Sequence, residues 1–155
     1  MASSSHSSSF ACENVYSESK HGWIANGIGE GSWIKIEFHR FIKISKIIYR
    51  HNDKLPGKCC NQNFKDISFQ FSDGSLVNVT VDDVFESGTN VDFNYRIDTP
   101  KLSSNLLIMA NSVYNHTRAA DGFENAGQPL YANNAFGISS IRVWGTIEAG
   151  KGAEV

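Results

Sequence analysis

Apolar side chains alternate with polar ones in three separate stretches of this 155-residue chain, and this alternation constrains the fold more than any other feature. The stretches are residues 33–38, 67–71 and 91–97. Successive side chains of a β-strand point to opposite faces, so a period of two is typical of a strand with one buried face. The pattern therefore predicts strands that bury one face against a second layer.

Turn signals and further apolar stretches complete the prediction of an all-β chain. Ser72-Asp73-Gly74-Ser75 predicts a tight hairpin, because Asp-Gly supplies the positive φ of a short turn, and the returning strand covers residues 76–81. Residues 91–97 are expected to end as a strand at Pro100, and the unbroken apolar run at residues 106–109 predicts a strand buried on both faces. A last strand follows at residues 138–144, and we find no helical pattern. Several short strands separated by turns favour a sandwich or a barrel.

The length predicts one domain, over residues 12–147, with flexible tails at residues 1–11 and 148–155. Hydrophobic residues make up 41% and charged residues 19%, which fits a globular protein and excludes a disordered one. The formal charge of -2 and the pI near 6.2 argue against nucleic acid, or an anionic membrane surface, as a partner. No apolar stretch has the length of a transmembrane segment.

The cysteines and the N-terminus leave the cellular compartment open. An odd set of three cysteines is a poor disulfide framework, so Cys12 either pairs with Cys59 or Cys60 or stays reduced. The Ser-rich N-terminus lacks the basic flank and apolar core of a secretory signal. Either the protein is cytosolic, or a signal was removed and a leader added. The glycosylation sequons at Asn78 and Asn115 matter only in a secreted protein.

Five motifs follow one another in order between residues 12 and 145. They are Gly22-Trp23, Gly27-Ile28-Gly29-Glu30-Gly31-Ser32-Trp33-Ile34-Lys35-Ile36-Glu37-Phe38, Ile47-Ile48-Tyr49-Arg50, Lys65-Asp66-Ile67-Ser68-Phe69-Gln70-Phe71-Ser72-Asp73-Gly74-Ser75 and Gly137-Ile138-Ser139-Ser140-Ile141-Arg142-Val143-Trp144-Gly145. In this order they resemble discoidin-type domains, also called coagulation factor 5/8 type C-like domains. A glycan-binding subgroup attached to some NAD-hydrolysing enzymes shares the Gly-Ile-Gly-Glu turn. The resemblance implies an antiparallel jelly-roll β-sandwich of the galactose-binding-domain-like type, whose members are mostly lectin or adhesion modules.

Two departures from the family pattern narrow what the resemblance implies. Many members hold a structural calcium between an acidic loop before the first Trp and a Glu in the last strand. Here residues 17–21 read Ser-Glu-Ser-Lys-His, and Ser140 stands in place of that Glu. Calcium needs several carboxylate oxygens, so we expect ligand binding without calcium and no metal or other cofactor. The His and paired basic residues of fucose-binding relatives are not found, so fucose is not implied.

Three loops mix aromatic and planar polar side chains, and the resemblance implies that they gather at one end of the sandwich. An aromatic face can cover the C–H face of a sugar while planar polar groups bind its hydroxyls. The candidate ligand-binding residues are Trp23 and Asn26 in the first loop, Arg50, His51, Asn52 and Asp53 in the second, and Tyr114, His116, Arg118, Asp121, Phe123, Glu124, Tyr131 and Asn133 in the third. Structural roles are the alternative: this Trp is usually a core residue in the family, and the second loop can be a solvated turn.

These observations predict a calcium-independent carbohydrate-binding (lectin-like) module whose partner is a glycan or glycoconjugate. The alternative is a protein- or membrane-binding adhesion module with Leu55, Phe123 and Leu130 exposed at loop tips. Linked weak sites gain avidity, which favours a homo-oligomer. An enzyme is not expected. No His spacing fits a catalytic metal, and the Gly-rich turn at residues 27–31 lacks the Lys-Ser/Thr of a phosphate-binding loop.

Overall fold

The computed structural model describes residues 1–2, 15–16, 23–24, 30–51, 54–55, 58–59, 64–82, 92–114 and 137–147, and within this part the chain is nearly all β-strand. The strands are β1 (Trp23–Ile24), β2 (Trp33–His51), β3 (Lys54–Leu55), β4 (Lys58–Cys59), β5 (Phe64–Phe71), β6 (Leu76–Thr80), β7 (Asp92–Val113) and β8 (Gly137–Ile147). Six of them hydrogen-bond in the order β1-β8-β2-β7-β5-β6, and β3 pairs with β4. The predicted all-β class is confirmed.

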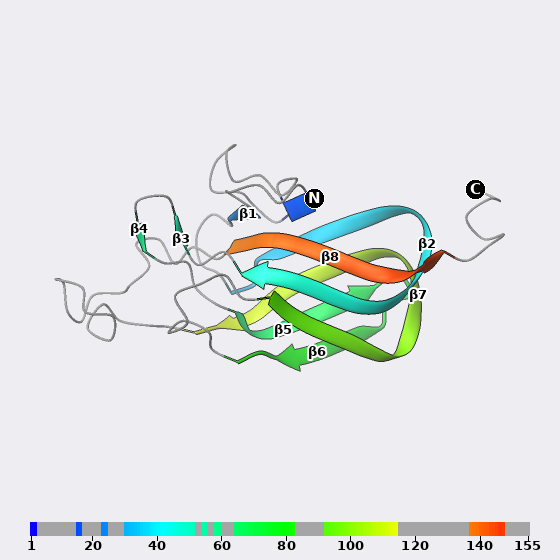
Figure 1. The fold of residues 1–155 in the computed structure, drawn as a ribbon. Helices are drawn as coiled ribbons and strands as arrows, with labels where there is room; N and C mark the ends of the chain where they lie inside the picture. The colour runs from blue at the N-terminus through cyan, green and yellow to red at the C-terminus, as the bar shows by residue number, and fades with distance from the viewer. Residues whose placement is uncertain are drawn as a thin grey trace.

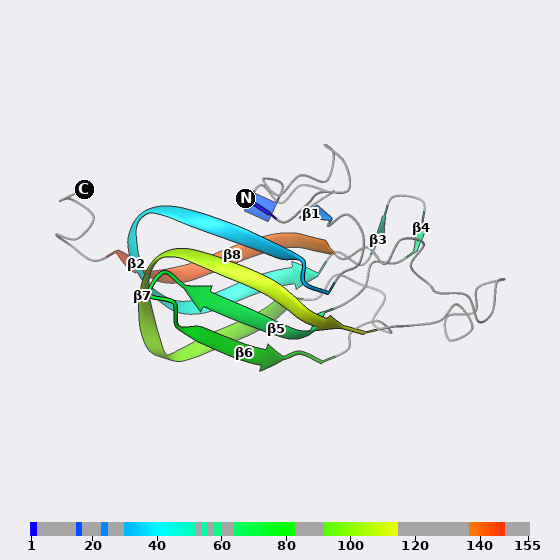
Figure 2. The same ribbon diagram turned by 180° about the vertical axis from the view of Figure 1, so that it is seen from behind.

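The two longest strands, β2 and β7, each bend and pass from one layer of a sandwich to the other. Residues 33–37 of β2 pair with residues 105–109 of β7, whereas residues 46–50 pair with residues 92–96, with register shifts between. Figures 1 and 2 show both strands turning back near the C-terminal end of β8. One layer therefore contains the first half of β2, the second half of β7, β5 and β6. The other contains β1, β8, the second half of β2 and the first half of β7, which confirms the antiparallel sandwich.

Two predicted strand features differ from the structure. Pro100 lies inside β7 and does not end a strand; it is exposed, between the paired residues Arg96 and Lys101. A residue without an N–H group is tolerated at such a bend, where the ladder is interrupted. The run at residues 106–109 has one fully buried face, not two, because Leu107 and Met109 are only half-buried.

The polar segment at residues 58–63 begins with a short strand. Lys58–Cys59 forms β4, which pairs with Lys54–Leu55. A strand of two residues is too short to leave a hydrophobic period in the sequence. Residues 60–63 lie outside the described part.

Aromatic side chains join the two layers in the core. The Tyr49 ring lies 5.2 Å from the Phe64 ring in an edge-to-face arrangement and 5.0 Å from the Phe93 ring in a stacked one. Tyr49 and Phe93 stack within one layer, whereas Phe64 belongs to the other, so the Tyr49–Phe64 contact crosses the interface. Phe69 and Tyr95 make a second such contact at 5.3 Å. Aromatic pairs of this geometry stabilise by about 0.5–1.5 kcal/mol beyond the area that they bury.

The predicted hairpin at residues 72–75 is confirmed. Gly74 has a φ of 83°, and its N–H group donates a 2.9 Å hydrogen bond to the carbonyl oxygen of Phe71. The N–H group of Phe71 in turn donates to the carbonyl oxygen of Ser75 at 3.0 Å. The left-handed residue closes the turn because glycine has no Cβ to oppose that conformation.

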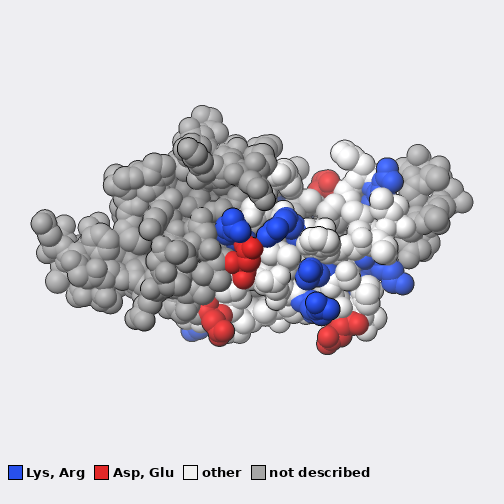
Figure 3. All heavy atoms as spheres, in the orientation of Figure 1, with Lys and Arg blue, Asp and Glu red and all other residues white. Residues whose placement is uncertain are grey.

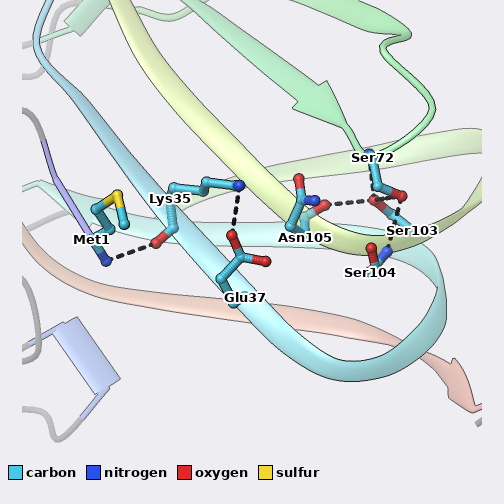
Figure 4. A network of polar contacts seen from close by, with 7 residues as sticks. All are labelled: Met1, Lys35, Glu37, Ser72, Ser103, Ser104 and Asn105. Carbon is cyan, nitrogen blue, oxygen red and sulfur yellow. Dashed lines mark hydrogen bonds and ion pairs between the residues drawn. The ribbon is translucent and has the colours of Figure 1, made fainter. Parts of the chain in front are cut away.

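Serine side chains hold this hairpin against the bend of β7 (Figure 4). The hydroxyl oxygen of the fully buried Ser103 accepts a 2.8 Å hydrogen bond from the N–H group of Ser72. The same hydroxyl group donates to the carbonyl oxygen of Asn105. The N–H group of Ser104 donates to the Ser72 hydroxyl oxygen at 3.0 Å. These bonds satisfy polar groups that the bend would otherwise leave unpaired in the core.

The first two residues extend the layer that contains the first half of β2. Ala2 bridges Ile34, and the N–H group of Lys35 donates to the carbonyl oxygen of Met1 at 2.7 Å. The N-terminal ammonium group donates to the carbonyl oxygen of Lys35 at 3.1 Å (Figure 4). Residues 3–11 and 148–155 lie outside the described part, so the predicted domain boundaries stay a prediction. No helix in the described ranges is long and apolar enough to cross a membrane.

Candidate functional site

The three predicted loops attach to strands whose termini lie together on one side of the sandwich. This side is opposite the bends of β2 and β7 (Figures 1 and 2). We call this the loop end and define it by Arg50 and His51 at the end of β2, Asp92 at the start of β7, Tyr114 after β7, and Gly137 and Ile138 at the start of β8. Trp23 and His51 both have Ile138 as their Cα partner. The backbones of residues from the first and second predicted loops therefore flank the same residue of β8.

Two guanidinium groups converge on one carboxylate at the loop end. Arg50 donates from Nε to Asp92 Oδ1 at 2.8 Å and from Nη2 to Asp92 Oδ2 at 3.2 Å, a bidentate pair. Arg142 donates from Nη2 to Asp92 Oδ2 at 2.9 Å. The three residues come from β2, β7 and β8, and the side chain of Asp92 is 29% exposed. Bidentate pairing fixes the plane of a guanidinium, so the cluster presents rigid polar groups at the surface.

The electrostatics of this cluster keep Asp92 ionised. Hydrogen bonds from Arg50 hold the pKa of the Asp92 carboxyl below its usual range, and the charges of Arg50 and Arg142 act in the same direction. Partial burial opposes them without reversing the shift. The cluster carries two positive charges and one negative charge, and the Arg142 side chain is 45% exposed. It can therefore offer N–H donors and carboxylate lone pairs to the hydroxyl groups of a bound molecule.

Tyr114 has a structural contact at the far side of the loop end. Its hydroxyl group donates to the carbonyl oxygen of Val81 at 2.8 Å, which ties the end of β7 to the residue after β6. The ammonium group of Lys65 lies 5.9 Å from the centre of its ring. Tyr114 thus positions the start of the third predicted loop.

The remaining candidate residues divide by what the structure describes. The backbones of Trp23 and His51 are placed by their strands. The predicted residues outside the described part are Asn26, Asn52, Asp53, His116, Arg118, Asp121, Phe123, Glu124, Tyr131 and Asn133.

Sequence reasoning missed Asp92 and Arg142, which complete the arrangement around the predicted Arg50. Both are polar residues at outward positions of alternating strands, and that pattern alone is typical of solvated side chains. Asp92 begins its strand, which was an available signal, whereas Arg142 lies in the middle of β8 and had none. Their convergence depends on the register of β2 with β7 and β8. Within the described ranges, no group of three or more His, Cys, Asp or Glu side chains could hold a metal ion.

Comparisons with known proteins identify the architecture. No protein-family model matches the chain, and no curated protein matches it either. Among solved structures, the family 32 carbohydrate-binding module of C. perfringens NanJ, in complex with galactose, is similar with a TM-score of 0.62 at 12% identity, covering 92% of this chain and 90% of that one. The chain has the same antiparallel β-sandwich fold as this module. The fold that the sequence motifs imply is thereby confirmed.

Two further structures share this β-sandwich fold. The lectin domain of lectinolysin, complexed with Lewis B antigen, has a TM-score of 0.59 at 10% identity, with 94% of this chain and 91% of that one covered. Reduced XRCC1, bound to the catalytic domain of DNA polymerase β, has a TM-score of 0.57 at 16% identity, with 94% of each chain covered. Proteins that bind sugars and a protein that binds another protein thus share the fold of this chain.

Proposed function

We propose that this chain is a carbohydrate-binding module, without catalytic activity of its own, that holds a glycan at the loop end. The observation that carries the proposal is the convergence of Arg50 and Arg142 on Asp92. Paired guanidinium N–H groups and a carboxylate can each bind two neighbouring sugar hydroxyls, and their mutual hydrogen bonds hold them in place before the sugar arrives. Recognition by preorganised planar groups needs little ordering on binding.

The fold supports the same proposal. The NanJ module and the lectin domain of lectinolysin were solved with galactose and Lewis B antigen, respectively. The segments that follow β2 and precede β8 carry aromatic and amide side chains that the sequence assigns to ligand binding, including Asn52, Tyr131 and Asn133. We propose that these loops complete the site around the Arg50–Asp92–Arg142 cluster.

We further propose that binding does not need calcium. Ser140, where the resembling family has a Glu ligand, is buried in β8, and its neutral hydroxyl group brings no negative charge to a cation. Calcium sites depend on several carboxylates, and the segment at residues 17–21, which stands for the acidic loop of the resembling family, has only Glu18.

A glycan array carried out with and without EDTA tests the proposal. We expect binding to glycans with terminal galactose or related sugars, with equal signals in both conditions. Arg142→Gln should lower the affinity for the best glycan about ten-fold or more, because hydrogen bonds to charged groups contribute about 1.5–3 kcal/mol. Arg40→Gln, an exposed arginine in the bend of β2 at the opposite end, is the matched control and should bind like the wild type.

The outcomes separate this function from its alternatives. Binding abolished by EDTA would contradict calcium independence while leaving glycan binding in place. Equal loss in Arg142→Gln and Arg40→Gln would move the site away from the loop end. Light scattering on the same samples tests the predicted homo-oligomer, which is expected to give steeper binding to dense glycan surfaces than to single sugars.

The second candidate function is a protein-interaction module, and the similarity to XRCC1 bound to a polymerase domain favours it. An array without any glycan signal, together with capture of a protein through the loop end, would support this alternative. Loss of that capture in Arg142→Gln, but not in Arg40→Gln, would place the protein interface on the same cluster.

A further inference from the structure

A second surface with binding chemistry lies away from the loop end. A pocket of about 440 Å³ opens on the outer face of the layer formed by β8, the second half of β2 and the first half of β7. Its lining consists of Ser45, Lys46, Arg96, Ile97, Asp98 and Trp144. Lys46 is the Cα partner of both Arg96 and Trp144, so these three residues form one row across three strands. Because the next residue, Ile47, is buried in the core, the Lys46 side chain points to the outer face.

Trp144 gives this pocket an aromatic surface. The residue is 52% exposed on the outer face of its layer. The ammonium group of Lys46 lies 4.7 Å from the centre of the indole ring, within the range of a cation–π interaction. The Ser45 hydroxyl group donates to the carbonyl oxygen of Trp144 at 3.3 Å, which holds this part of β8 against β2. The indole is therefore held in place while much of it faces solvent.

The charges around the pocket are predominantly positive. Lys46 and Arg96 line it together with one acidic residue, Asp98, and Arg142 projects from the same outer face two residues before Trp144. Figure 3 shows Lys and Arg side chains gathered on this face over β8, β2 and β7, with fewer acidic ones among them. This concentration contrasts with the net charge of -2 for the whole chain. A local excess of cations on an otherwise acidic protein selects an anionic ligand.

We propose that the pocket around Trp144 is a second saccharide site, selective for an anionic sugar. The indole would cover the C–H face of the ring, Asp98 would accept hydrogen bonds from its hydroxyls, and Arg96 and Lys46 would bind its carboxylate or sulfate. A volume of about 440 Å³ lies within the range of small-ligand pockets, about 300–1,000 Å³. A planar carboxylate can engage the guanidinium of Arg96 in two parallel hydrogen bonds.

The site is separate from the loop end and does not depend on the function proposed there. Lys46 precedes Arg50 by four residues on β2, so at about 3.3 Å per residue these two residues are about 13 Å apart, while Arg142 of the loop-end cluster lies two residues from Trp144 on β8. Their lining residues do not overlap, since Arg50, Asp92 and Tyr114 are not part of the pocket wall. Substitutions can therefore disable one site and leave the other intact.

The test is a titration of the ¹⁵N-labelled protein, followed by nuclear magnetic resonance, with three sugars of matched length: a galacturonate trisaccharide, a sulfated galactose trisaccharide and a neutral galactose trisaccharide. We expect an acidic trisaccharide to shift the indole N–H signal of Trp144 and to bind about ten-fold more tightly there than the neutral one, as a charge-assisted hydrogen bond would give. The two acidic sugars distinguish a carboxylate ligand from a sulfate ligand. Preference for either over the neutral sugar supports the proposal.

Variants make the result specific to the pocket. Trp144→Ala, followed through the backbone N–H signals of Lys46 and Arg96, and Arg96→Gln should each weaken binding of the acidic sugar at least about ten-fold, whereas Arg40→Gln and the loop-end variant Arg50→Gln should not. All of these side chains are at least partly exposed, so folding should be preserved, and the remaining backbone signals report it.

Three results would overturn the proposal. One is an equal shift of the Trp144 signal by acidic and neutral sugars. Another is an equal shift by sodium acetate or sodium sulfate alone, which would indicate an ion-binding surface without sugar recognition. The third is weakening by Arg50→Gln together with no effect of Arg96→Gln, which would place the acidic sugar at the loop end.

Discussion

Arg50 and Asp92 stand opposite each other on β2 and β7 and are joined by two hydrogen bonds, of 2.8 and 3.2 Å. Their backbones are Cα partners in the ladder, so the register of the two strands determines that the side chains meet. Arg142 approaches the same carboxylate from β8 on the other side of β2. One acidic side chain thereby links three strands at the loop end.

We predict that Asp92→Asn lowers the free energy of unfolding by about 1 kcal/mol at neutral pH, the upper range for a partly exposed ion pair. The hydrogen bonds from Arg50 lower the pKa of Asp92 in the folded protein, so its stabilisation is present above the pKa of the unfolded chain. It is lost as the pH falls through the lower pKa of the folded state. Urea denaturation of both proteins at neutral pH and near pH 2 checks this. If the difference in the free energy of unfolding between the wild type and Asp92→Asn were the same at both pH values, the mechanism would be contradicted.

We predict that Ser103→Ala lowers the free energy of unfolding by about 1–3 kcal/mol. Ser103 is fully buried, and its loss would leave the N–H group of Ser72 and the carbonyl oxygen of Asn105 without their hydroxyl partner. Ser104→Ala is the matched control, because Ser104 contributes its backbone N–H group to this network. Chemical denaturation should show a large loss for the first variant and a change within about 0.5 kcal/mol for the second. Equal effects would show that the hydroxyl bonds of Ser103 do not stabilise the bend.

We predict that Tyr49→Phe is at least as stable as the wild type. The Tyr49 ring packs between Phe64 and Phe93, but its buried hydroxyl group has no hydrogen-bond partner within the described residues. A buried hydroxyl without a partner costs about 1–3 kcal/mol, and phenylalanine removes that cost while keeping the ring contacts. Thermal and urea denaturation measure the change. A loss of more than about 1 kcal/mol would mean that the hydroxyl group makes a stabilising bond.

We also predict that ionisation of Tyr49 makes the folded protein less stable at alkaline pH. Burial raises the pKa of its phenol group in the folded protein, so the unfolded chain loses this proton first as the pH rises. Tyr49 contributes fully to the free energy of unfolding below the pKa of tyrosine in the unfolded chain, about 10. Its contribution decreases as the pH rises above that value. Denaturation of the wild type and Tyr49→Phe across this range should show a steeper decline for the wild type. Parallel declines would indicate that Tyr49 ionises normally.

We predict that Gly145→Ala lowers the free energy of unfolding by about 1–3 kcal/mol through overpacking. A methyl group at Gly145 would overlap with the carbonyl oxygen of Lys43 and lie 2.9 Å from Cγ2 of Ile42. These atoms belong to β2, next to the pairing of Gly145 with Ile44, so relief requires β8 to move. Thr146→Ala, at the exposed neighbouring position, should change stability by less than about 0.5 kcal/mol. Similar effects of the two substitutions would contradict this packing argument.

Alternation of side chains determined the fold class without any coordinates. The strands at Trp33–His51, Phe64–Phe71 and Asp92–Val113 each contain a predicted stretch, because burial of one face imposes the period on the sequence itself. The turn at Gly74 was equally local, since its positive φ depends on adjacent residues alone. The bends within β2 and β7 are harder to predict from the sequence. Pro100 was expected to end a strand that in fact passes through it.

The sequence by itself also predicted Arg50 as a ligand-binding residue at the loop end, but it did not predict Asp92 or Arg142. Asp92 follows Arg50 by 42 residues along the chain, and Arg142 follows Asp92 by 50. Only the pairing of β2 with β7 and β8 brings them into hydrogen-bond distance, and pairing depends on the collapse of the whole core. The pairing of β2 with β8 likewise brings Trp144 next to Lys46. Local sequence determines which side chains face outward, whereas tertiary register decides which of them become neighbours.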